Sequence, residues 1–209
     1  MITRYEDLPL GEYMKIDAIL RGEGDELEKQ VRVIALLSGN TEDEVLALPL
    51  DEYASRSAKA AFLAKPYQQS GEVKRTAKEF VIGGMTLIPT TDFTKITTAQ
   101  YVDFQTFAKE FPATLPQVLG VLLVPKGKRY NEDYDMAAVV DSVKQLPMPV
   151  GMDLAAFFFA RFAQSTTAML TSLEKALPKT SNPAKREALK AKIRMAKTLL
   201  ARVGGGLRT

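Results

Sequence analysis

The sequence contains no cysteine, no histidine and no tryptophan. Without cysteine and histidine, the chain lacks disulfides, thiolate nucleophiles, imidazole bases and the commonest zinc ligands. A hydrolase triad built on its serines or threonines would need an unusual base such as lysine. No glycine-rich stretch has the strand, loop and helix context of a phosphate-binding loop. The composition therefore predicts that the protein is not an enzyme and has no catalytic residues and no cofactor.

Long apolar runs are also missing. No stretch approaches the ~20 consecutive apolar residues that a membrane-spanning helix needs. The first ten residues, MITRYEDLPL, lack the apolar core of a secretory signal. The chain has 209 residues, of which 46% are hydrophobic, so it can bury a sizeable core. We therefore expect a folded protein of the cytoplasm that has no membrane partner.

Charge is distributed unevenly along the chain. The net charge is +3, but the segment from Glu174 to the C-terminus has ten basic and two acidic residues, a net +8, which leaves −5 for the rest. A basic segment on an acidic body indicates an anionic partner, or contact with the body of another copy.

Acidic residues cluster where helices are predicted to start, and capping explains their positions. In TEDE, Thr41 can accept a hydrogen bond from the backbone N–H of Glu44, and the Glu44 carboxylate can accept one from the N–H of Thr41. Glu42 and Asp43 lie in the same first turn, where the helix dipole stabilises carboxylates. The loop YNEDYD lacks the glycine and the terminal glutamate of a calcium loop. No metal site is therefore predicted.

Start and stop signals predict four helices in the first third of the chain. Proline is favoured in a first helical turn because its missing N–H would have no partner there, so Pro9 and Pro49 mark helix starts. The predicted helices run from Pro9 to about Leu20, from Asp25 to Gly39, from Thr41 to Leu46, and from Pro49 through Tyr53 to Phe62. The core-facing stripe of the second helix comprises Leu27, Val31, Ile34 and Leu37.

The stretch AKEFVIGGMTLIPTTDF differs in kind from its surroundings. FVI and MTLI are rich in β-branched and aromatic residues, and Gly83 and Gly84 between them are typical of a two-residue hairpin turn. Pro89 ends the second strand. The sequence therefore predicts a small β-hairpin between two helical halves.

The second half again shows helical signals. Thr97 and Gln100 can form a capping box that opens a helix, and LPQVLGVLLVP is apolar enough to be buried on most sides. A polar loop is expected over Pro125 to Asp135, followed by a helix from about Met136 to Lys144. The long run DLAAFFFARFAQSTTAML predicts a central buried helix.

The end of the chain predicts a basic amphipathic helix. Asn182 can cap it and Pro183 can open it, and the glycines of GGG, Gly204 to Gly206, are expected to end it. Its apolar stripe comprises Leu189, Ile193, Ala196, Leu200 and Val203. Its candidate partner-binding face comprises Lys185, Arg186, Lys190, Arg194, Lys197 and Arg202. Three interpretations stay open: a docked helix with a solvated charged face, a protein-binding face, and, less favoured because aromatic residues are not interleaved, a nucleic-acid-binding face.

The two halves resemble each other in the order of their motifs. YEDLPLGEYMKI aligns with FTKITTAQYVDF, with Tyr13 over Tyr101; further on, Gln30 lies over Gln117 and the LPL before DEY lies over LPM. A duplicated helical unit would explain this order, and chance similarity of helical patterns is the alternative. The expected fold is mainly α with a small β-hairpin. Its parts are an N-terminal helical half (1–78), the hairpin connector (79–90), a C-terminal helical half (91–178), and the basic helix with a flexible end (179–209).

One segment also resembles a known family. VRVIALLSGNTEDEVLALPLDEYASRSAKAAFL is similar to the tail assembly chaperones of bacteriophages, including those of the Mu-like group, in which a helix ending in an A-L-x-G phrase precedes T/S-x-E-E and L-P-x-x-D/E-Y/F phrases. The matching residues are Ala35, Leu36, Leu37, Gly39, Thr41, Asp43, Glu44, Leu48, Pro49, Leu50, Glu52 and Tyr53. The second half resembles structural-module proteins of phages of Bacteroides and its relatives through TTAQYVDF, LLVPKGKRYNEDYDM and LAAFFFARF.

The resemblance implies a protein without an active site that acts in phage morphogenesis. A tail assembly chaperone in the host cell cytoplasm would cover the apolar helices of a tape measure protein until the tail tube polymerises. The alternative is a structural virion protein, such as a ring, connector or neck component at the portal and tail, built as a symmetric homo-oligomer. A weaker alternative is a nucleic-acid-binding accessory protein that uses the basic helix. Thr41, Glu44, Pro49 and Tyr53 are expected to be structural residues of the motif, with Tyr53 facing the core.

Overall fold

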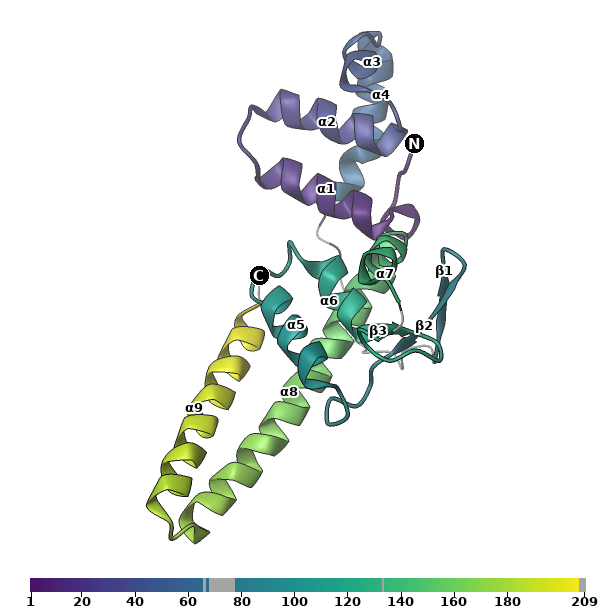
Figure 1. Ribbon diagram of the computed structural model, residues 1–209. Helices are drawn as coiled ribbons and strands as arrows, with labels where there is room; N and C mark the ends of the chain where they lie inside the picture. The colour runs from purple at the N-terminus through teal and green to yellow at the C-terminus, as the bar shows by residue number, and fades with distance from the viewer. Residues whose placement is uncertain (66, 68–77, 133, 207–209) are drawn as a thin grey trace.

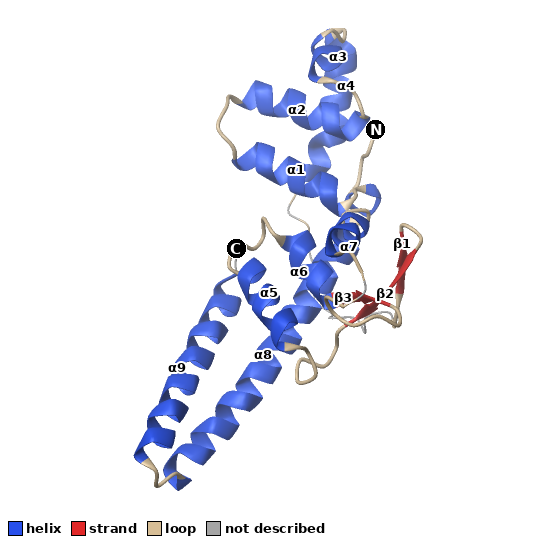
Figure 2. Cartoon of the chain, in the orientation of Figure 1, coloured by secondary structure: helices blue, strands red, loops and turns tan. Residues whose placement is uncertain are grey.

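The computed structural model describes residues 1–65, 67, 78–132 and 134–206, and of 195 and 199–206 it describes the backbone only. This part of the chain forms α-helices and one small three-stranded antiparallel sheet (Figures 1 and 2). The helices are α1 (Leu10–Arg21), α2 (Glu26–Ser38), α3 (Glu42–Leu46), α4 (Leu50–Ala60), α5 (Thr98–Ala108), α6 (Leu115–Leu122), α7 (Met136–Val143), α8 (Met148–Ala176) and α9 (Pro183–Gly206). The fold is therefore mainly α with a small hairpin, as the sequence predicts.

Helices α1 to α4 pack as a separate group at one end of the molecule (Figure 1). Two small clusters hold them together. The first has Leu8, Ile16, Val33 and Leu37 at its centre, and the second has Val31, Ile34, Ala35 and Val45. The predicted stripe of α2 is correct except for Leu27, whose side chain is 61% exposed. Leu27 lies in the first turn of α2, beyond the reach of both clusters.

The predicted helix starts in this group are confirmed by their capping geometry. The predicted end of the fourth helix at Phe62 is not, because α4 ends at Ala60 and Ala61–Ala64 form a 3-10 helix. Asp25 accepts a hydrogen bond from the Glu28 backbone N–H at 2.8 Å, and Gly39 ends α2 in the left-handed conformation at φ 69°. That φ favours glycine because it has no Cβ. Pro9 and Pro49 are the last extended residues before α1 and α4.

The predicted hairpin consists of β1 (Phe80–Ile82) and β2 (Met85–Pro89), joined by Gly83 and Gly84 at φ 57° and 76°. Two positive φ angles are typical of the tight turn that matches strand twist. A third strand, β3 (Leu123–Pro125), pairs antiparallel with β2 and was not predicted. The sequence analysis places these residues in a buried apolar segment, and the change from helix α6 to strand occurs within one apolar run. The hairpin therefore packs on the core of the C-terminal half.

Helix α8 is the centre of the largest core. Its first half buries Leu154, Phe158 and Phe162 against α6 and its neighbours, including Leu119. Its second half leaves this core and runs beside α9, so that the two helices form an arm (Figure 1). The helix begins at Met148, five residues before the predicted run DLAAFFFARFAQSTTAML, so Met148 to Met152 are its first residues.

Three predictions about the second half need correction. Thr97 accepts a hydrogen bond from the Gln100 N–H, but the Gln100 side chain does not complete a capping box; it donates to the Val121 carbonyl at 2.8 Å. The loop from Pro125 to Asp135 is not wholly solvated, because Tyr130 is 6% exposed and belongs to the core. Helix α9 continues through the three glycines to Gly206 instead of ending before them. The end expected to be flexible, 207–209, lies outside the described residues.

The helices of the two halves pack in the same order. Helix α2 contacts α1, α3 and α4, and α6 contacts α5, α7 and α8. The halves differ where β3 directly follows α6. The duplication stays a prediction, consistent with this order of contacts.

A short backbone bridge joins the two halves. Pro9 and Pro147 lie opposite each other as an isolated antiparallel pair. The Leu10 N–H donates to the Leu146 carbonyl at 2.7 Å, and the Met148 N–H donates to the Leu8 carbonyl at 2.8 Å. Two Leu-Pro-apolar segments, each at the start of a helix, thus form backbone hydrogen bonds with each other.

Candidate partner-binding surfaces

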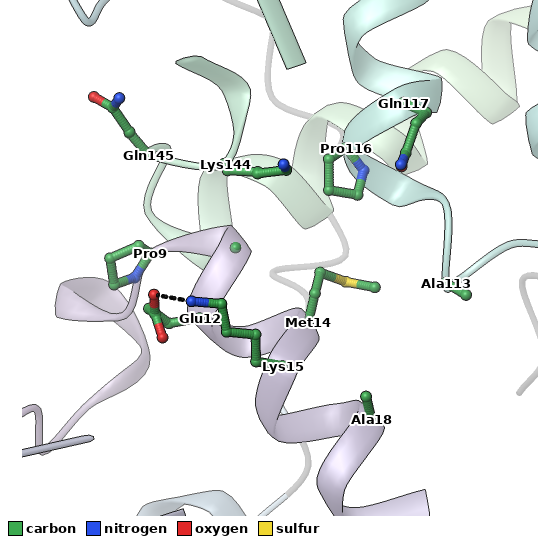
Figure 3. A pocket seen from close by; sticks show the side chains of 11 residues that line it. Pro9, Glu12, Met14, Lys15, Ala18, Ala113, Pro116, Gln117, Lys144 and Gln145 are labelled. Atoms are coloured by element: carbon green, nitrogen blue, oxygen red, sulfur yellow. Dashed lines mark hydrogen bonds and ion pairs between the residues drawn. The ribbon is translucent and has the colours of Figure 1, made fainter. Parts of the chain in front are cut away.

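A groove of about 620 Å³ lies between α1, the start of α6 and the end of α7 (Figure 3). Its walls are mostly apolar. They comprise Pro9, Gly11, Met14 and Ala18 from the α1 segment, Ala113 and Pro116 from the α6 segment, and the stems of Lys15 and Lys144. Because α1 belongs to one half and α6 and α7 to the other, the bridge at Pro9 and Pro147 positions both walls.

Gly11 permits the close approach of these walls. Its N–H donates to the Lys144 carbonyl at 2.8 Å. A Cβ built at Gly11 would lie 2.9 Å from the Lys144 Cβ, closer than side-chain atoms normally pack. A larger residue at this position would therefore push α1 away from the end of α7 and widen the groove.

The polar and charged residues that line the groove are Glu12, Lys15, Gln117, Lys144 and Gln145. Glu12 and Lys15 form an ion pair at 2.9 Å (Figure 3), and Lys144 is paired with Asp141 at 2.8 Å. Gln117 Oε1 is buried and has no hydrogen-bond partner among the described residues. A buried carbonyl oxygen without a partner costs free energy.

The predicted capping box is present. The Glu44 N–H donates to Thr41 Oγ1 at 3.2 Å, and the Thr41 N–H donates to the Glu44 carboxylate at 2.9 Å. This second bond, with a bond from the Asn40 side chain, holds the pKa of Glu44 below its usual value. The favourable interaction is therefore present above the ordinary glutamate pKa and is lost as the pH falls through the lowered one. An N-terminal cap of this kind typically contributes about 1 kcal/mol to stability.

Pro49 and Tyr53 hold α4 in place. Pro49 precedes the first turn of α4, and Tyr53 lies one turn later, half-buried against the cluster around Val45. The Tyr53 hydroxyl donates to Gln30 Oε1 on α2 at 2.9 Å. The four motif residues thus have structural positions and contact no groove.

The described basic side chains of α9 differ in their surroundings. Ile193 and Ala196 are buried between α9 and the rest of the chain, while Lys185, Arg186 and Arg194 are exposed. Lys190 pairs with Glu187 at 2.7 Å and Lys197 pairs with Glu174 of α8 at 3.1 Å. The side chain of Arg202 lies outside the described part, as do those of Leu200 and Val203.

The helix α9 is therefore a docked amphipathic helix whose start is capped as predicted, since Asn182 Oδ1 accepts from the Lys185 N–H at 3.2 Å. None of the basic residues of α9 whose side chains the structure describes lines the groove at α1. Partner binding by its charged face stays a prediction.

Within the described residues, no group of three or more acidic side chains is placed to hold a metal ion. Asp133, in the acidic loop, lies outside that part. The described helices also include none that is long and apolar enough to cross a membrane.

Neither a protein-family model, nor a curated protein, nor a solved structure matches this chain. The functional proposal therefore depends on the residues of the chain itself. The groove was not predicted from the sequence, because its lining residues are about a hundred positions apart and are of common types. The unpartnered amide of Gln117 can be recognised only once its neighbours are known.

Proposed function

We propose that the protein is a non-enzymatic bacteriophage morphogenesis protein that binds other phage proteins, and that it acts as a tail assembly chaperone in the host cell cytoplasm. In this role it covers apolar helices of the tape measure protein until the tail tube polymerises. The observation that carries the proposal is the apolar groove between α1, α6 and α7. An apolar groove between helices fits the apolar face of a partner helix.

The resemblance to tail assembly chaperones supports the choice of partner. The resembling segment, Val31 to Leu63, covers most of α2 and all of α3 and α4. Helix α2 packs on α1, and α3 and α4 pack on α2, so the segment supports one wall of the groove. Its motif residues cap and orient these helices and leave the groove itself to α1. The proposed binding groove and the motif residues thus lie in different parts of the fold.

Ala18→Arg is expected to weaken binding of the tape measure protein at least about tenfold. Ala18 is an exposed residue of α1 that lines the groove. Arginine is tolerated there by the helix, but it would place an uncompensated charge where the partner's apolar face docks. Titration calorimetry with the purified tape measure protein of the same phage measures the change.

Ala168→Arg is the matched control, since Ala168 is an exposed alanine of helix α8 outside the groove. Ala168→Arg adds the same positive charge as Ala18→Arg, also at an exposed helical alanine. Equal affinities of wild-type protein and Ala18→Arg, with both folded, would rule out the groove as the binding surface.

A structural virion protein is the second candidate. The α8–α9 arm favours this candidate, because the arm projects from the core (Figure 1). Its exposed basic side chains would contact either an acidic neighbouring protein in a ring or the phosphates of DNA. A nucleic-acid-binding accessory protein would use the same side chains.

Mass spectrometry of purified particles separates the two candidates. For a chaperone, the protein is expected in tail assembly intermediates and absent from mature virions. Its stoichiometric presence in mature virions would overturn the chaperone proposal in favour of the structural one.

A further inference from the structure

The junction between α3 and α4 carries a third Leu-Pro-apolar segment. The first two, Leu8-Pro9-Leu10 and Leu146-Pro147-Met148, pair with each other in the bridge that joins the halves. The third is Leu48-Pro49-Leu50. Each of the three precedes or opens an α-helix with its proline as the last extended residue.

The backbone of the third segment has the conformation of the other two. Pro49 has φ −54° and ψ 145°, compared with −62° and 143° for Pro9 and −53° and 135° for Pro147. Equal dihedral angles orient the flanking N–H and C=O groups in the same way. The Leu50 N–H and the Leu48 carbonyl therefore project as the corresponding groups do in the bridge.

The third segment lacks the partner that the other two have. Among the described residues, neither the Leu50 N–H nor the Leu48 carbonyl makes a backbone hydrogen bond. Leu50 is 81% exposed and Leu46, which precedes the segment, is 67% exposed. Leu10 and Met148, the residues that correspond to Leu50, are at most 1% exposed. The segment thus presents large exposed apolar side chains beside an unused backbone donor and acceptor, as the edge of a sheet does.

We propose that two copies of the protein associate through their Leu48-Pro49-Leu50 segments, which form an antiparallel bridge about a twofold axis. The internal bridge joins two segments of the same kind, and an antiparallel pair of identical segments satisfies both partners at once. The Leu50 N–H of each copy donates to the Leu48 carbonyl of the other. Such an interface is self-complementary, as twofold symmetry requires. Leu46 and Leu50 of both copies become buried beside the bridge.

The charge beside the segment gives the dimer a distinctive salt dependence. Asp51 and Glu52 follow Leu50 directly in the first turn of α4. Glu52 is paired with Arg56 of the same helix at 2.7 Å, so the repulsion that the twofold axis creates is between the Asp51 carboxylates of the two copies. Their repulsion is screened by salt, and added salt therefore strengthens the dimer. Association of the basic α9 with an acidic body would instead weaken as salt is added. The interaction uses a surface separate from the groove and does not depend on the proposed chaperone function.

Two substitutions at one position test the bridge. Leu50→Ala removes the apolar side chain but keeps the N–H donor. Leu50→Pro also removes the donor, yet it leaves the helix start intact because proline is favoured at the first helical position and Pro49 already has the extended conformation that a following proline requires. The difference between the two variants therefore reports on the backbone bond.

Sedimentation velocity over protein concentrations from about 1 μM to about 1 mM measures the dimer constant. We expect a concentration-dependent dimer of the wild-type chain that is tighter at high salt. Leu50→Ala is expected to weaken it about tenfold, and Leu50→Pro about tenfold further, through loss of both symmetric hydrogen bonds. Leu27→Ala, at the 61% exposed leucine of α2, is the control and leaves the dimer unchanged. Circular dichroism shows whether each variant keeps its helices.

Cross-linking provides a second readout that does not need the proline variant. The chain has no cysteine, so Leu50→Cys introduces its sole thiol, and a short bismaleimide is expected to link two copies at this position and not in Leu27→Cys. A wild-type chain that stays monomeric at every concentration and salt would falsify the proposal. A dimer that is unaffected by both Leu50→Ala and Leu50→Pro, or one that dissociates as salt is added, overturns it equally.

Discussion

Phe158→Ala is expected to lower the free energy of unfolding by about 3–5 kcal/mol, the largest effect of any change considered. Phe158 lies in the first half of α8 and is completely buried in the core that α6, α7, the sheet and α8 share. Removing its ring takes away the apolar contacts and leaves a cavity that the surrounding helices cannot close. Urea denaturation followed by circular dichroism measures the loss.

Met169→Ala is the matched control for this change. Met169 lies in the second half of the same helix, in the arm outside the core, and is 46% exposed. Its replacement is expected to change the free energy of unfolding by no more than about 0.5 kcal/mol. Similar losses for Phe158→Ala and Met169→Ala would show that the first half of α8 is not the centre of the core.

Leu10→Ala is expected to lower the free energy of unfolding by about 2–5 kcal/mol. Leu10 opens α1, in the N-terminal half, but its side chain is fully buried in the core of the C-terminal half. Gly151 lets α8 pass close by, since a Cβ built there would lie 2.8 Å from Leu10 Cδ2. The substitution thus leaves a cavity at the contact between the halves.

Leu20→Ala, in the last turn of the same helix, is the control for Leu10→Ala. Leu20 is 48% exposed, so its truncation is expected to cost no more than about 0.5 kcal/mol. Equal stabilities of Leu10→Ala and Leu20→Ala would contradict the assignment of Leu10 to the shared core. Because Leu10 also positions α1 beside the groove, Ala18→Arg is the cleaner test of partner binding.

Local features of the fold follow directly from the sequence. The capping box at Thr41 and Glu44, the left-handed Gly39 and the turn at Gly83 and Gly84 all occur where the residue types require them. Each of these features depends on residues within four positions of one another. Their chemistry therefore decides the backbone conformation before any long-range contact forms.

Predictions that needed distant contacts were less successful. Gln100 has the right spacing for a capping box, but its side chain donates to Val121, twenty-one residues away. The apolar run after Leu115 continues from α6 into β3 because the edge of β2 is available to pair with it. In both cases several partners suit the residue equally well in the sequence, and only the packed structure selects one.

Local sequence signals set where α1 to α4 begin, where the hairpin turns, and that the C-terminal helix is basic on one face. The tertiary structure decided how the halves meet, which residues line the groove, and which of three similar Leu-Pro-apolar segments is left without a partner. The physical reason is that every backbone N–H and C=O is chemically alike. Residue type can thus show that a segment is extended and ready to pair, but only the arrangement of the helices shows that Pro9 lies opposite Pro147 and that Pro49 has no partner among the described residues.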